Sequence, residues 1–78
     1  MTLKLDQAAD ALYIRLSDAE ITKTLELNPD MYADVDARNN VVGIEILNVS
    51  TYKQLDIPPA PVHFDDLKVL GAQYANFF

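Results

Sequence analysis

The sequence has no cysteine, no tryptophan and only two glycines among its 78 residues. The absence of cysteine excludes a disulfide framework, a thiolate metal site and a cysteine nucleophile. Because Gly43 and Gly71 are the only glycines, the chain has no glycine-rich loop of the kind that holds phosphate groups. No apolar run approaches the roughly 18 residues that a membrane-spanning helix needs. The first residues show no charged-then-apolar signal region, so we expect a cytoplasmic protein with no membrane association.

Basic residues are also scarce, with 6 Lys and Arg against 12 Asp and Glu and a net charge of −6. An acidic surface repels phosphate backbones, so we expect no nucleic-acid binding by the chain on its own. Apolar residues make up 50% of the sequence, which is typical of a globular protein, and the length admits one domain, residues 1–78. A chain of this length has a small core, and burial of further apolar surface against a second copy would stabilise it. We therefore expect a homo-oligomer, with a dimer favoured.

The first part of the chain, residues 1–48, alternates between apolar and polar residues. A period of two is typical of strands with one buried face. The alternation predicts five short strands over residues 2–6, 11–16, 21–27, 31–36 and 41–47. Pro29 separates the third strand from the fourth, because proline cannot donate a hydrogen bond within a sheet.

The fourth and fifth strands are expected to form a hairpin around residues 37–40. In the predicted register, Asp36 pairs with Val41, and three apolar pairs then share one face: Val35–Val42, Ala33–Ile44 and Met31–Ile46. Tyr32 faces Glu45 and Asp34 faces Gly43 on the other side. A slip of one residue would bury Asp34 and Glu45, so this register is strongly preferred. Gly43 indicates either a bulge or a close approach of backbone.

The last part, residues 49–78, follows a different pattern. Three prolines within residues 58–61 predict an extended connector. Asp65 and Asp66 suit the start of a helix, and Leu67, Leu70, Tyr74 and Phe77 follow at helical spacing. We therefore predict a helix from about Asp65 to Asn76. The expected fold class is α+β: an antiparallel meander of about five short strands with the C-terminal helix packed on one face.

Two stretches resemble a known family of small proteins, domain of unknown function 2283 (DUF2283). They are residues 6–16, DQAADALYIRL, and residues 31–47, MYADVDARNNVVGIEIL. The intervening residues 24–27, TLEL, fit the spacing of the family, and the resemblance covers roughly residues 3–50. The family usually has Tyr where Leu5 stands and Glu where Ala8 stands, and Gly is common where this chain has Asn39 or Asn40. The lack of an acidic residue at position 8 disfavours any metal or catalytic scheme that needs one there.

The family name carries no reaction, so the resemblance implies only a compact, strand-rich module. Members are often encoded beside small toxin-like proteins, which implies an antitoxin-like or immunity role by analogy. From this we expect a small, acidic, non-enzymatic module that binds another protein and has no cofactor. By the antitoxin analogy, this partner is a small basic protein.

The alternative is a divalent-cation or small-ligand binding protein that uses an acidic sheet face. Asp34, Asp36 and Glu45 share that face in the predicted register, and carboxylate oxygens suit Mg²⁺ or Ca²⁺. The competing interpretation is an ordinary solvated surface, and we favour it. A small hydrolase is a weaker alternative, because His63 is the only histidine and no nucleophile motif accompanies it.

Aromatic and arginine side chains supply the candidate interface residues: Tyr13, Arg15, Tyr32, Phe77 and Phe78. Tyrosine and arginine are enriched where proteins bind one another, although a Tyr–Arg pair is also an ordinary feature of an exposed sheet. We expect Phe77 to close the core and Phe78 to contact a second subunit or another partner, with fraying of the chain end as the alternative.

Overall fold

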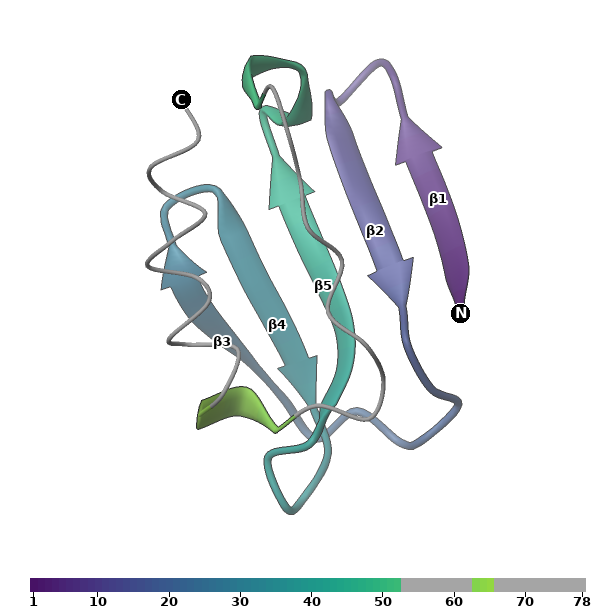
Figure 1. Cartoon of the computed structure of the whole chain (residues 1–78), viewed down its shortest axis with the longest axis vertical. Helices are drawn as coiled ribbons and strands as arrows, with labels where there is room; N and C mark the ends of the chain where they lie inside the picture. Colours follow the sequence, from purple (N-terminus) through teal and green to yellow (C-terminus); the bar gives the residue numbers. More distant parts are fainter. Residues whose placement is uncertain (53–62, 66–78) are drawn as a thin grey trace.

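The structure is a computed structural model, and it describes residues 1–52 and 63–65. Five strands in this part of the chain form one antiparallel sheet (Figure 1). They are β1 (Thr2–Asp6), β2 (Ala11–Arg15), β3 (Lys23–Asn28), β4 (Met31–Val35) and β5 (Val41–Leu47). A short 3-10 helix, η1 (Val49–Thr51), follows β5 directly. The five predicted strands are therefore confirmed.

The strand order is β1-β2-β5-β4-β3, so the prediction of a simple meander is wrong. Residues 16–22 carry the chain from β2 past β5 and β4 to the far edge, where the Thr22 amide donates to the Val35 carbonyl at 2.8 Å. The physical reason lies in β5, in which five of seven residues are buried. A meander would place β5 at an edge, where one of its flanks would face water. No residue of β1 or β3 is buried, so these two strands suit the edges.

The predicted hairpin register is confirmed for the four pairs from Met31–Ile46 to Asp34–Gly43. Beyond them the register shifts, and Val35 pairs with Val41 instead of Val42. Val42 is thus the extra residue of a β-bulge, and its carbonyl accepts hydrogen bonds from the amides of Leu16 (2.7 Å) and Ser17 (3.3 Å). The bulge therefore ties β5 to the end of β2.

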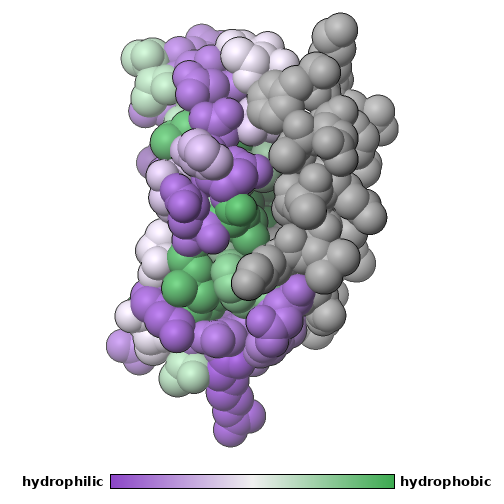
Figure 2. All heavy atoms as spheres, turned by 90° about the vertical axis from the view of Figure 1, so that its left-hand side faces the viewer, coloured by the Kyte–Doolittle hydropathy of each residue, from purple (hydrophilic) through white to green (hydrophobic). Residues whose placement is uncertain are grey.

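The core lies on one face of the sheet. Its buried residues come mainly from β2, β4 and β5: Ile14, Leu16, Met31, Ala33, Val35, Val41, Ile44, Ile46 and Tyr52. Asp34 and Glu45 point to the opposite face, so the predicted sidedness of the hairpin is confirmed. Seen from the β3 side, hydrophobic residues gather in the middle of the described surface, between hydrophilic ones (Figure 2).

Strand β1 is an exception to this sidedness. Leu3 and Leu5 pair with Ile14 and Leu12 and so belong to the core side, yet they are 56% and 55% exposed. All five residues of β1 are exposed. The apolar layer of the sheet therefore continues to an open edge.

The predicted α+β class is wrong for the part of the chain that the structure describes. Residues 1–52 and 63–65 contain no α-helix of seven residues or more and no helix long and apolar enough to cross a membrane. After β5 the backbone turns sharply instead, because Asn48 is left-handed (φ 53°) and η1 follows. Phe64 and Asp65 have helical backbone. The rest of the predicted helix, including Phe77, and the three prolines of the predicted connector lie outside the described residues.

Two aspartates from distant turns hold the residues after β5 in place. The amide and hydroxyl of Ser50 donate to the two carboxylate oxygens of Asp10 at 3.1 and 2.6 Å. The Tyr52 hydroxyl donates to Asp30 at 3.1 Å, and the Asn48 side chain donates to the same carboxylate. Burial, followed by this hydrogen bond and the charge of Asp30, raises the pKa of Tyr52 to about 12.

We predict that stability falls at high pH through Tyr52. The folded protein holds the phenol neutral, with a pKa of about 12, whereas the unfolded chain ionises it near pH 10. This contribution is complete below about pH 10 and is lost as the pH rises towards 12. Tyr52→Phe removes the hydrogen bond, so its free energy of unfolding at neutral pH should be about 1 kcal/mol lower than that of the wild type. Above pH 10, this free energy should fall less steeply with pH in the variant than in the wild type. Urea unfolding across this pH range measures both effects.

Asp30→Asn is the companion variant, because it keeps an acceptor for the Tyr52 hydroxyl but removes the negative charge. The fall in its free energy of unfolding with rising pH should be less steep than that of the wild type and steeper than that of Tyr52→Phe. An equally steep decline in all three proteins would contradict the assignment.

Candidate functional site

The outer face of the sheet carries a row of side chains that crosses all five strands. Directly opposite partners on successive strands place these residues side by side, in the order Glu26, Tyr32, Glu45, Tyr13 and Lys4. We call this set the Tyr–Glu row. Carboxylates and phenol rings alternate along it, and the single cation lies at the β1 end.

A second contact crosses the sheet beside this row. The Tyr13 hydroxyl reaches from β2 over Gly43 of β5 and donates to Asp34 of β4 at 2.7 Å. A β-carbon placed on Gly43 would lie 2.0 Å from the Tyr13 oxygen and 2.6 Å from the carbon that bears it. Gly43 therefore supplies the space in which the phenol lies, so the closest approach at this glycine is made by a side chain and not by backbone.

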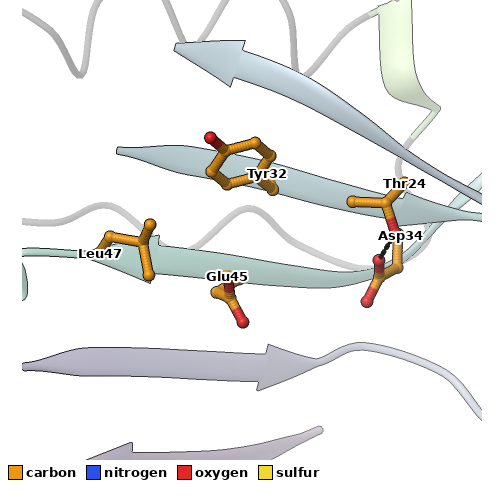
Figure 3. Close-up of a pocket in the computed structure, with 5 residues that line it drawn as sticks. All are labelled: Thr24, Tyr32, Asp34, Glu45 and Leu47. Atoms are coloured by element: carbon orange, nitrogen blue, oxygen red, sulfur yellow. Dashed lines mark hydrogen bonds between the residues drawn. The ribbon is translucent and has the colours of Figure 1, made fainter. Parts of the chain in front are cut away.

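Asp34 is fixed from both sides. Its second carboxylate oxygen accepts a hydrogen bond from the Thr24 hydroxyl of β3 (Figure 3). The hydrogen bonds thus run from β2 to β3 and span four adjacent strands. Burial raises the pKa of Tyr13, the hydrogen bond to Asp34 adds to the rise, and nearby Arg15 partly opposes it. Tyr13 is therefore a neutral donor, held in one orientation.

A shallow depression of about 360 Å³ opens on the β3–β4–β5 half of this face. It is lined by Thr24, Tyr32, Asp34, Glu45 and Leu47 (Figure 3). Within the described part of the chain, the Glu45 side chain makes no hydrogen bond or ion pair and is exposed. Its oxygens therefore face solvent beside an aromatic ring and an aliphatic side chain.

A second depression of about 300 Å³ lies towards β1 and β2. Glu45 and Leu47 line this depression as well, together with Tyr13 and Lys4. Glu45 thus stands between two hollows on one face, and each hollow has a tyrosine in its wall.

The three predicted acidic candidates do not form one cluster. Asp34 and Glu45 line the same depression, but Asp36 does not. The backbone amides of Asn40 and Arg38 donate to the Asp36 carboxylate at 2.9 Å each, and this lowers the pKa of Asp36. No group of three or more His, Cys, Asp or Glu side chains suited to a metal ion occurs within residues 1–52 and 63–65.

Of the predicted interface residues, Tyr13, Arg15 and Tyr32 all lie on the outer face. The Arg15 guanidinium donates to the carbonyl oxygens of Ser17 (2.6 Å) and Ala19 (3.1 Å), so it braces the connection after β2. Phe77 and Phe78 lie outside the described residues. Whether any of these residues forms an interface stays a prediction.

Sequence reasoning did not single out Thr24 and Leu47 as parts of the site. Both occupy outward positions in strands whose alternation was evident. Thr24 becomes informative only when β3 is known to pair with β4 so that it lies opposite Asp34. The predicted meander already placed β3 beside β4, so the missing information for Thr24 was the register between these two strands.

His63 has a structural environment in the described residues. Its ring Nε2 lies 2.9 Å from the Arg38 carbonyl, and the Phe64 amide donates to the Asn39 carbonyl at 2.8 Å. His63 also pairs with Asn40 as an isolated β-bridge and lies 3.5 Å from the Asp65 carboxylate. These contacts anchor residues 63–65 to the β4–β5 loop, away from the Tyr–Glu row.

The comparisons with known proteins agree with the resemblance seen in the sequence. The model of the family described as "Protein of unknown function (DUF2283)" matches residues 3–50, more than half of the chain, so the chain belongs to this family. No curated protein and no solved structure gives a significant match.

We predict that Gly43→Ala destabilises the protein by about 1–3 kcal/mol, because the added methyl group displaces the Tyr13 ring from Asp34. The backbone of Gly43 is not left-handed, so alanine meets no conformational strain there. The cost should fall sharply when the same change is made in a Tyr13→Ala background, where the Ile14 carbonyl oxygen, at 3.3 Å, is the remaining close contact. Urea unfolding of the four proteins in this double-mutant cycle measures the coupling. An equal cost in both backgrounds would show that the ring is not the obstacle.

Proposed function

We propose that this member of the DUF2283 family is a non-enzymatic protein-binding module that takes a basic segment of its partner on the Tyr–Glu row. One observation carries the proposal: Tyr32 lies directly between Glu26 and Glu45 on adjacent strands, at the wall of an open depression. Anionic and aromatic groups alternate there on a face that no described segment covers.

The chemistry of the depression suits an arginine or lysine side chain. The exposed Glu45 carboxylate offers acceptor oxygens to a cation, and the Tyr32 ring offers a π face. Leu47 supplies an apolar wall for the aliphatic stem of such a side chain. The net charge of −6 attracts a basic partner at long range.

The donor set favours this function over the cation-binding alternative. Both carboxylate oxygens of Asp34 already accept hydrogen bonds, from Tyr13 and Thr24. Asp36 is engaged by its own loop. Glu45 is thus the one of the three acidic candidates that remains open to a ligand, which suits a single side-chain cation better than a multidentate metal ion.

Neutralisation of a small basic protein, as an antitoxin does, is the regulatory role that fits such a surface in the cytoplasm. The fixed Tyr13–Asp34–Thr24 contacts would serve this role by keeping the outer face rigid. A rigid surface loses less conformational entropy when it binds.

A peptide titration tests the proposed site. A hexa-arginine peptide added to ¹⁵N-labelled protein should shift the amide signals of Tyr32, Glu45 and Leu47 most strongly, while a hexa-glutamate peptide should shift none of them. Glu45→Gln should weaken binding at least tenfold, because a charged hydrogen bond contributes about 1.5–3 kcal/mol. The measurement is NMR chemical-shift perturbation, with affinities from the titration curves.

Glu20→Gln is the matched control, because it makes the same substitution at an exposed glutamate in the β2–β3 connection. It should keep at least half of the wild-type affinity. Equal weakening by the two variants would indicate diffuse attraction to an acidic protein, and it would overturn the proposed site, as would shifts confined to other faces.

A further inference from the structure

The two edges of the sheet differ in how well they are protected against pairing with another strand. The β3 edge is interrupted by a register irregularity between Glu26 and Asn28, and Pro29 follows it. Strand β1 keeps a continuous register with β2 over all five of its residues, without a bulge or a proline (Figure 1). Irregularities and prolines are the usual protections of an edge strand, so β1 is the edge that is open to a further strand.

Exposed apolar side chains gather at the same edge. Among the described residues, the large exposed hydrophobic side chains are Met1 (75%), Leu3 (56%), Leu5 (55%) and Ile21 (37%). Three of these four belong to β1 or precede it directly. Leu3 and Leu5 extend the core side of the sheet beyond Ile14 and Leu12. A strand added beside β1 would therefore continue both the hydrogen bonding and the apolar layer.

We propose that a second copy of this chain occupies the β1 edge, with the two β1 strands antiparallel and the two five-stranded sheets joined into one. The inference goes beyond the proposed function and does not depend on it. The pairing is isologous, so each residue of β1 must complement the residue that the two-fold axis places opposite it.

The sequence of β1 is complementary to itself in one register. Side chains on one face must pair with one another, so Lys4 can lie opposite Thr2, Lys4 or Asp6 of the second copy. Opposition of Lys4 to Lys4 places like charges together, and opposition to Thr2 leaves Asp6 without a partner. When Lys4 lies opposite Asp6, two ion pairs form on the outer face and Leu5 lies against Leu5 on the core side.

This arrangement places equivalent faces of the two copies on the same side. The two-fold axis runs perpendicular to the joined sheet, so the outer faces form one continuous surface. The Tyr–Glu rows of both copies then lie on it, with their Lys4 ends towards the axis. On the other side, Leu3 and Leu5 of both copies share one apolar patch.

A charge-exchange experiment tests the register. Sedimentation velocity of the full chain should show a dimer for the wild type. Lys4→Glu should place glutamate opposite Asp6, and Asp6→Lys should place lysine opposite Lys4, so each variant alone should be monomeric. An equimolar mixture of the two variants should form a mixed dimer, because one ion pair is restored with its charges exchanged and the other is the unchanged pair of Lys4 with Asp6. Native mass spectrometry, with one variant isotopically labelled, identifies the mixed species.

Two further variants guard against loss of folding. Asp6 also accepts a hydrogen bond from the Ala9 amide at 3.1 Å, so Asp6→Lys disturbs a turn as well as the interface. Leu5→Asp should abolish the dimer without that change, while Ile21→Asp, the same kind of change in the β2–β3 connection, should preserve it. Circular dichroism verifies that each variant is folded. A monomeric wild type, or folded dimers of both Lys4→Glu and Leu5→Asp, would overturn the proposal.

Discussion

The position of β5 between β2 and β4 is the constraint on which the other features depend. This strand is the most deeply buried of the five, and its residues from Gly43 to Ile46 pair with a neighbour on each side. The β1–β2 hairpin is attached to the rest of the sheet only through it. Its bulge at Val42 shifts the register with β4, and Gly43 leaves the space in which the Tyr13 ring crosses β5. The core on one face and the Tyr–Glu row on the other are both consequences of this single placement.

Local pattern was sufficient to predict the strands and the register of the central hairpin. Alternation at Met31, Ala33 and Val35, matched by Ile44 and Ile46, leaves one alignment that buries no carboxylate, and the structure has that alignment up to the bulge. The bulge was foreseeable only as a property of Gly43. Its position one residue earlier depends on the amides of residues 16 and 17, which are distant in the sequence.

The order of the strands could not be predicted from alternation. A period of two residues indicates which face of a strand is buried, but it does not indicate which strand lies beside it. The apolar content of β5 was the available signal, since so buried a strand is costly at an edge. The candidate site was limited by the same gap. Asp34 and Glu45 could be placed on one face from the hairpin. The contact of Asp34 with Tyr13 required the knowledge that β2 lies beside β5, and the contact with Thr24 required the register between β3 and β4.

The position of β5 between β2 and β4 also determines when the sheet can assemble during translation. The β1–β2 hairpin is complete once residue 15 has been added, yet the strand that pairs with its other side ends at Leu47. Two strands cannot pair before both have been synthesised, and non-local pairing delays folding. On the nascent chain, β2 therefore waits with an unpaired flank while the β3–β4–β5 unit is synthesised. The sheet closes only when its last strand is inserted between segments that are already present.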